Sequence, residues 1–212
     1  MEGYTELINE QNFAINTVWV AICAALIFFM EAGFALLEAG FVRSKNAMSI
    51  IAKVIIDITF GGIAFFIVGF GIAYGSSNGW FALDFGIMNQ DLGLGLTVSN
   101  NLFWFIQLGF AIAAISIVSG ALAERMKLFP YAILVIFFCA IRYPLVANWV
   151  WNPNGWLAMR GFNDFAGSAA VHAMGGFAAL AAAIVLGPRI GKYSKDGKSN
   201  TIPGHNLPLA SV

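Results

Sequence analysis

The chain alternates between long apolar stretches and short polar connections. Five of the stretches are long enough to cross the hydrocarbon core of a bilayer, for which a helix needs about 20 residues. We expect these spans at residues 17–37, 54–74, 102–122, 131–149 and 166–186. The connections hold most of the charged residues, as the loops between membrane helices do. The pattern therefore predicts an all-α polytopic membrane protein with five transmembrane helices.

Composition supports the membrane interpretation and excludes several functions. The chain is 59% hydrophobic and only 10% charged, whereas an ordinary soluble domain is about 25% charged. A soluble protein with one large core is the alternative, but it does not explain five regular stretches separated by polar loops. Cys23 and Cys139 lie inside predicted spans and form no metal-binding spacing. No nucleophile–base pair or phosphate loop appears, so we expect no enzyme, metal, cofactor or nucleic-acid partner.

The positive charges predict an orientation. Nine of the eleven basic residues lie in alternate connections, namely Arg43, Lys45, Lys53, Arg125, Lys127, Arg189, Lys192, Lys195 and Lys198. Because cytoplasmic loops are enriched in Lys and Arg, the N-terminus is predicted outside and residues 187–212 in the cytoplasm. Five tryptophans cluster at the predicted outer ends, where such rings favour the interface: Trp80, Trp104, Trp149, Trp151 and Trp156.

Asp164 and His172 are the most informative ionisable residues, because such groups are expensive at membrane depth. Asp164 stands at the start of the fifth span, where it either caps the helix or lowers the energy of an incoming cation, and both roles can coexist. His172 lies eight residues further, roughly 12 Å along a helix, as a packing residue or as a pore residue. The Gly- and Ala-rich fifth span predicts close helix packing and hence a buried, central helix.

Four other charges fall in or near the spans and need partners. Glu31 is deep in the first span, and Arg142 is a candidate partner for it. Glu38 lies near the predicted inner end, where it caps the helix or pairs with Arg43. The pattern assigns no partner to Asp57.

Several motifs resemble those of ammonium transporters of the Amt/Mep/Rh family. They are Met30–Gly40 with Arg43–Asn46, then Gly120–Arg125, the run Asp164-Phe-Ala-Gly-Ser-Ala-Ala-Val-His172, and His205-Asn-Leu-Pro208. These motifs run in order through most of the chain. The resemblance implies an eleven-span bundle of two inverted halves, assembled as a homotrimer. Residues 1–186 would then form the first half-bundle, and residues 187–212 a cytoplasmic loop leading to a missing second half.

The resemblance also implies roles for individual residues. Phe110 would be an outer aromatic gate, and Trp151 would belong to the site that recruits NH₄⁺. Asp164 would support recruitment or deprotonation, and His172 would be the first of two pore histidines. The pore would conduct NH₃ with or without the proton. Ile106 stands where family members commonly have an aromatic residue, so the outer site is expected to differ.

The function implied by the resemblance is ammonium transport across the plasma or inner membrane. The alternative is an ammonium sensor, in which an Amt-like membrane domain is joined to a cytoplasmic signalling domain. A PII-type regulator at the basic inner face is a further family expectation, besides the lipid bilayer itself.

Overall fold

A computed structural model of the chain describes residues 2–86, 88 and 90–211. In this part the regular elements are helices, and five of the spans that they form are long and apolar enough to cross a membrane, as predicted. The first is α1 (Glu2–Phe41) and the third is α5 (Asn100–Leu122). The second is composite, with η1 (Ser44–Asn46), α2 (Ala47–Ile56), η2 (Asp57–Gly61), α3 (Gly62–Ala64), η3 (Phe65–Gly69) and α4 (Phe70–Tyr74). The fourth joins α6 (Leu128–Phe137), η5 (Phe138–Arg142) and α7 (Tyr143–Trp151), and the fifth joins η7 (Ser168–Ala173) and α8 (Met174–Leu186).

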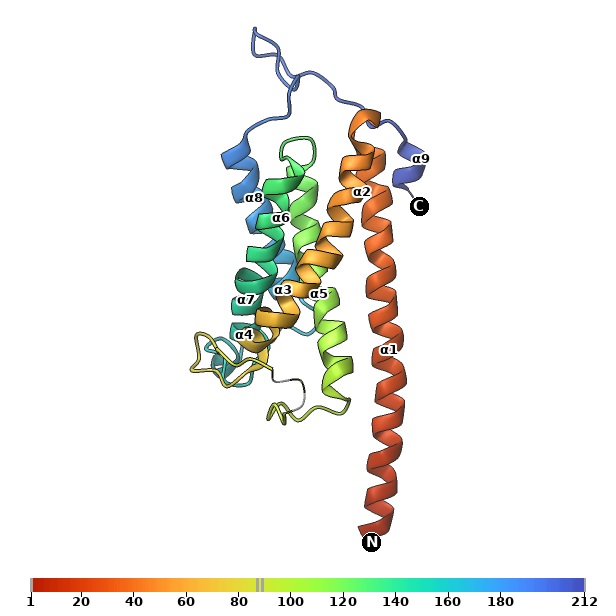
Figure 1. Cartoon of the computed structure of the whole chain (residues 1–212), viewed down its shortest axis with the longest axis vertical. Coiled ribbons are helices and arrows are strands. Elements are labelled where there is room, and N and C mark those ends of the chain that lie inside the picture. Colours follow the sequence, from red (N-terminus) through yellow and green to blue (C-terminus); the bar gives the residue numbers. More distant parts are fainter. Residues whose placement is uncertain (1, 87, 89, 212) are drawn as a thin grey trace.

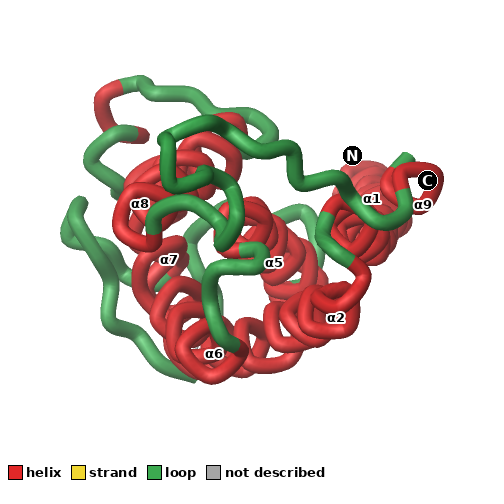
Figure 2. Tube along the Cα trace, turned by 90° about the horizontal axis from the view of Figure 1, so that it is seen from above, coloured by secondary structure: helices red, strands yellow, loops and turns green. Residues whose placement is uncertain are grey.

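Helix α5 lies at the centre of the bundle, with the other spans around it (Figure 2). Ser99 caps its N-terminus, because the hydroxyl of Ser99 accepts a hydrogen bond from the amide of Leu102. Its middle is completely buried, as the exposed fractions of Ile112 and Ile115 are 0%. Apolar side chains of the second and fourth spans pack around it and form the main core.

The second and fourth spans contain wide π-helical turns and approach each other closely. Pro144 lacks an amide hydrogen, and the π-helical turn η5 precedes it, as expected where a helix must accommodate a missing donor. A Cβ atom on Gly69 would lie 2.3 Å from the carbonyl oxygen of Cys139 and 2.9 Å from Pro144 Cγ. Only glycine therefore allows this contact between the two spans.

The fifth span is not the buried central helix that its Gly- and Ala-rich sequence predicted. One side does approach α5 closely, because a Cβ on Gly175 would lie 2.8 Å from the carbonyl oxygen of Ala114. The other side is open, and Phe177 and Val185 are 72% and 83% exposed. Small residues produced one close contact and left the opposite face uncovered, so α5 holds the central position in this chain.

Helix α1 is longer than the predicted span at residues 17–37. It starts at Glu2 and contains 40 residues, or roughly 60 Å, twice the thickness of a hydrocarbon core of about 30 Å. No proline interrupts it and no glycine is present between Tyr4 and Glu31. The polar residues before the predicted span therefore contain no helix breaker after Gly3, and the helix continues through them. Its first turns extend past the neighbouring helices (Figure 1).

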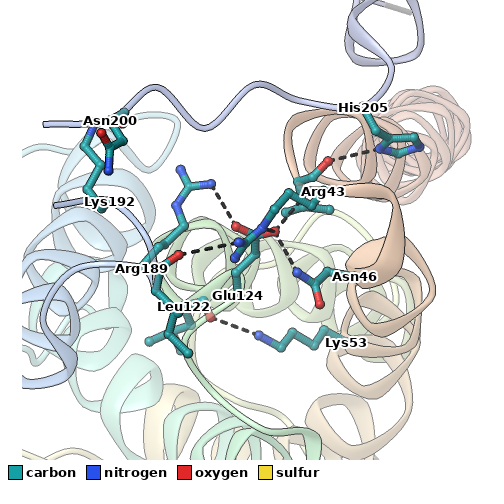
Figure 3. A network of polar contacts seen from close by, with 11 residues as sticks. Arg43, Asn46, Lys53, Leu122, Glu124, Arg189, Lys192, Asn200 and His205 are labelled. Carbon is teal, nitrogen blue, oxygen red and sulfur yellow. Dashed lines mark hydrogen bonds and ion pairs between the residues drawn. The ribbon is translucent and has the colours of Figure 1, made fainter. Parts of the chain in front are cut away.

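The two ends of the bundle differ in chemistry. We call one the basic end, where Arg125 and Arg189 line one pocket and Arg43 lies nearby (Figure 3), and the other the aromatic end, where Trp80, Trp149 and Trp156 pack together. From α8, residues 187–206 cross the basic end and return to α1, against which α9 (Leu207–Ala210) packs (Figure 1). The amide of His205 donates to the carbonyl oxygen of Val42 at 3.1 Å.

Glu124 joins three separate segments at the basic end (Figure 3). Its Oε1 accepts hydrogen bonds from the amide and Nε of Arg43, both at 3.0 Å, and from Asn46 Nδ2 at 2.7 Å. Its Oε2 lies 3.4 Å from a guanidinium nitrogen of Arg189. Glu124 has the left-handed φ of 61°, which is uncommon outside glycine. Burial alone would raise its pKa, but the hydrogen bonds from Arg43 and Asn46 lower the pKa of Glu124 to about 2.

Candidate functional site

A cavity of about 370 Å³ lies at the aromatic end, between the second, third and fourth spans and the start of the fifth. Three of the four residues that the sequence predicted for the site line it, namely Phe110, Trp151 and Asp164. The rest of the lining comprises Tyr74, Leu94, Leu96, Phe103, Gln107, Pro153, Asn163 and Phe165. The wall is therefore mainly apolar and aromatic with a few polar groups, the usual composition of a small-molecule site.

Two aromatic rings of the cavity lining pack against each other at a tilted angle. The ring centroids of Phe110 and Trp151 are 5.7 Å apart, with an angle of 46° between the planes. Trp151 Nε1 donates a hydrogen bond to the carbonyl oxygen of Asp164 at 2.7 Å. This bond fixes the indole relative to the start of the fifth span. The arrangement offers aromatic faces to a small cation, for which such faces are good partners.

Asp164 caps the first turns of the fifth span. Its Oδ1 accepts from the amide of Gly167 at 3.0 Å, and its Oδ2 accepts from the amides of Ala169 and Ala170 at 2.9 and 2.8 Å. Gly167 has a φ of 94°, and a Cβ there would lie 2.8 Å from Val171 Cγ2, so the turn requires glycine. The cap interpretation is confirmed. Asp164 is 8% exposed and lines the cavity.

Gln107 and Tyr74 are polar cavity residues that the sequence analysis missed. In the described part of the chain, Gln107 Oε1 and the Tyr74 hydroxyl are buried and have no hydrogen-bond partner. Gln107 follows Phe103 by one turn of α5, and Phe110 follows Gln107 by another, so all three share one face. This i, i+4, i+7 spacing in the sequence could have placed Gln107 beside Phe110. Tyr74 gave none, because only the fold brings the end of the second span to this cavity.

His172 lies outside this cavity. It belongs to η7, where its amide bonds to the carbonyl oxygen of Gly167 at 3.0 Å, and its side chain is exposed. The structure thus brings Phe110, Trp151 and Asp164 together and places His172 further along the fifth span.

The partners considered for Glu31 and Glu38 were wrong. Glu31 Oε2 accepts a hydrogen bond from Ser116 rather than pairing with Arg142, which is exposed. Glu38 is bonded by Ser119, while Arg43 pairs with Glu124. Both errors have one cause: α5 presents serines to α1, and a hydroxyl donates a hydrogen bond to a carboxyl group without supplying an opposite charge.

Comparisons with known proteins agree on one family. Residues 18–212 match the model described as Ammonium Transporter Family. Ammonium transporter Amt2 of Archaeoglobus fulgidus is 40% identical to this chain, over 99% of the chain and 46% of its own length. Ammonium transporter Amt1 of Methanocaldococcus jannaschii is 43% identical, over 92% of the chain and 48% of its own length. The chain thus spans about half the length of these relatives.

Solved structures share the fold. A structure named "Sensor Amt Protein" is 42% identical, with a TM-score of 0.87 over 95% of this chain and 51% of that one. Saccharomyces cerevisiae Mep2 is 26% identical, with a TM-score of 0.80 over 92% of this chain and 44% of its own.

Proposed function

This chain belongs to the ammonium transporter family, and from that premise we propose that its protein moves ammonium across the cell membrane, binding the cation first in the cavity at the aromatic end. One observation carries this proposal: the cavity combines the ring faces of Phe110 and Trp151 with an unpartnered acceptor, Gln107 Oε1. An ammonium ion needs both, because it is a cation with four N–H donors.

Each cavity residue contributes a different interaction. The two ring faces attract the cation, a contribution of about 0.5–2 kcal/mol for a partly desolvated site. Gln107 Oε1 and the Tyr74 hydroxyl are buried, without a hydrogen-bond partner among the described residues, and they accept N–H donors from the ion once their side chains turn toward the cavity. The Asp164 carboxylate is already held by three backbone amides, so it acts on the ion by its charge and on the site by holding the turn. Cation affinity thus comes from several weak contacts that also permit release.

Beyond the cavity the ion must lose its proton, because a bare charge in an apolar passage is costly. His172, further along the fifth span, is the group that receives NH₃ or relays the proton, since imidazole both donates and accepts near neutral pH. Transport is electrogenic if the proton follows and neutral if it stays behind. The same proposal includes a homotrimer, with a PII-type regulator at the basic end.

The discriminating experiment measures ammonium-evoked current and ammonium binding in the full-length protein in a planar membrane. We expect Gln107→Leu and Trp151→Leu each to raise the ammonium concentration for half-maximal current several-fold. Trp80→Leu is the matched control, because Trp80 lies at the same end but outside the cavity. Unchanged half-saturation in both variants would remove the cavity from the pathway. Tight binding without current or uptake would favour a sensor, the role named for one solved relative, "Sensor Amt Protein".

A further inference from the structure

A cluster of buried ionisable groups lies between α1, the second span and α5, away from the cavity at the aromatic end. Its carboxyl groups are Glu31, Glu38 and Asp57, with exposed fractions of 1%, 7% and 0%, and Lys53 beside them is 1% exposed. In the described part of the chain, the other ionisable side chains among Asp, Glu, Lys, Arg and His that are buried are Asp164 and, at the basic end, Glu124. The proposed function assigns the cluster no role.

The hydroxyl of Ser116 has fewer hydrogens than its two contacts with carboxyl groups need. Ser116 Oγ lies 2.8 Å from Glu31 Oε2 and 3.4 Å from Asp57 Oδ2. A serine hydroxyl has one hydrogen, so it cannot donate to both ionised carboxylates. The other contact needs a hydrogen on the carboxyl group itself.

The same shortage recurs one turn further along α5. Ser119 Oγ bonds to Glu38 Oε1 and also lies 3.0 Å from the carbonyl oxygen of Ser116. One hydroxyl hydrogen again faces two acceptors. In addition, Glu31 Oε1 and Glu38 Oε2 are buried with no hydrogen-bond partner among the described residues. Each of these two carboxyl groups therefore has one oxygen bonded by a serine hydroxyl and one buried oxygen without a partner.

The charges show the same imbalance. Among the buried residues that the structure describes, Lys53 is the only cation, with its Nζ 3.2 Å from the carbonyl oxygen of Leu122 and 4.9 Å from the centroid of the Tyr131 ring. Tyr131 also donates to Asp57 Oδ1 at 2.6 Å, and the Cys139 thiol packs against Gly61 at the end of η2. Three ionised carboxylates against one ammonium would leave uncompensated buried charge. Such groups take up protons instead.

Two cavities connect the cluster to the basic end. One, of about 340 Å³, is lined by Glu38 together with Gly120, Ala123 and residues of the crossing segment. The other, of about 240 Å³, is lined by Lys53 together with Asn46 and Glu124. Glu38 therefore meets a cavity on one side and Ser119 on the other, and Ser119 Oγ also bonds to the backbone carbonyl oxygen of Ser116.

We propose that this cluster is a proton-exchange site that opens to the basic end, which the charge distribution predicts to face the cytoplasm. It holds at least one carboxyl group in the neutral acid form and exchanges that proton with solvent through Glu38. A carboxylate takes one proton from hydronium and leaves water, so no other reactant is needed. The proton passes between Glu38 and solvent through the cavity that Glu38 lines. The site is independent of whether the protein transports or senses ammonium.

Infrared spectroscopy of the full-length protein in lipid vesicles tests the first part. A neutral carboxylic acid has a C=O stretching band that carboxylates lack. We expect this band at neutral pH, and we expect at least one of Glu31→Gln, Glu38→Gln and Asp57→Asn to abolish it. Glu10→Gln on the exposed part of α1 is the matched control and leaves it unchanged. A wild-type protein without the band, or a band that survives all three substitutions, would overturn the proposal.

The route is tested separately by filling the cavity. A Cβ on Gly120 would lie 3.8 Å from Glu38 Oε1, in ordinary contact, so Gly120→Ile fills the cavity without a clash at Cβ. After transfer to D₂O, we expect the band to shift several-fold more slowly in this variant, with its intensity unchanged. An equal exchange rate would refute access through Glu38. Thermal unfolding of each variant shows that it is folded. Glu31→Gln is suited to this test because its amide supplies an N–H donor where the cluster lacks hydrogens.

Discussion

Replacing Glu124 by glutamine removes one negative charge from the basic end while keeping the side chain's shape. The substitution leaves the left-handed backbone of residue 124 in place, so it isolates the electrostatic contribution of the carboxylate. Arg43 and Asn46 keep an acceptor, but Arg189 faces an amide instead of an anion. We expect the three joined segments to separate more easily.

The size of the effect follows from the pKa of Glu124. Burial opposes ionisation, yet the bonds from Arg43 and Asn46 lower the pKa from 4.5 to about 2, a drop equivalent to roughly 3 kcal/mol. The side chains of Arg43 and Arg189 are each 33% exposed, so solvent screening reduces the net contribution to about 1–2 kcal/mol. Because folding lowers this pKa, the stabilisation is complete above pH 4.5 and disappears as the pH falls toward 2.

Thermal unfolding of the full-length protein in detergent is the assay, at neutral pH and at about pH 3. Glu124→Gln should lower the midpoint at neutral pH, and the gap to wild type should narrow in acid. Asp196→Asn is the control, because Asp196 is an exposed carboxylate beside Lys198 and such pairs contribute little. A variant as stable as wild type at neutral pH, or a gap that does not depend on pH, would refute the reasoning.

Two further substitutions test the packing and the cap. Gly69→Ala should destabilise the bundle by about 1–3 kcal/mol in thermal unfolding, because its Cβ would lie 2.3 Å from the Cys139 carbonyl oxygen. Gly33→Ala is the control, because a Cβ on Gly33 would have no atom within 4 Å. Equal melting temperatures of the two variants would contradict the close contact at Gly69. Asp164→Asn replaces one acceptor of the cap by a donor, so it should lower the stability of the protein by about 1–3 kcal/mol. It should also lower the ammonium-evoked current. A lost current with an unchanged melting temperature would show that the charge of Asp164 matters to transport and that its cap does not matter to stability.

The five membrane helices could be predicted because spanning a bilayer requires an apolar length that is visible in the sequence. Their lateral arrangement could not. Small residues in the fifth span predicted close packing, which occurs at Gly175, but one close contact does not make a helix central. The extension of α1 was missed because a hydropathy pattern locates the membrane, whereas a helix ends only where a breaker or cap stops it.

The candidate site divides in the same way. Phe110, Trp151 and Asp164 converge on one cavity, and the resemblance to ammonium transporters had already singled them out. Gln107 became visible as a binding group only when its oxygen was found buried without a partner. The partners of Glu31 and Glu38 are hydroxyls from another helix, and a serine in an apolar segment gives no charge signal. Polar contacts between spans depend on how the helices face one another, which hydropathy does not record.

Helix α5 carries both sites on one rigid rod, with Phe110 in the cavity and Ser116 in the proton cluster. Successive residues of a helix are turned by about 100°, so these two side chains point roughly 120° apart around its axis. Inserting or deleting a single residue between them would keep one site and swing the other away from its partners. The six-residue separation is therefore a fixed register: this stretch of α5 can change its side chains, but it cannot change its length.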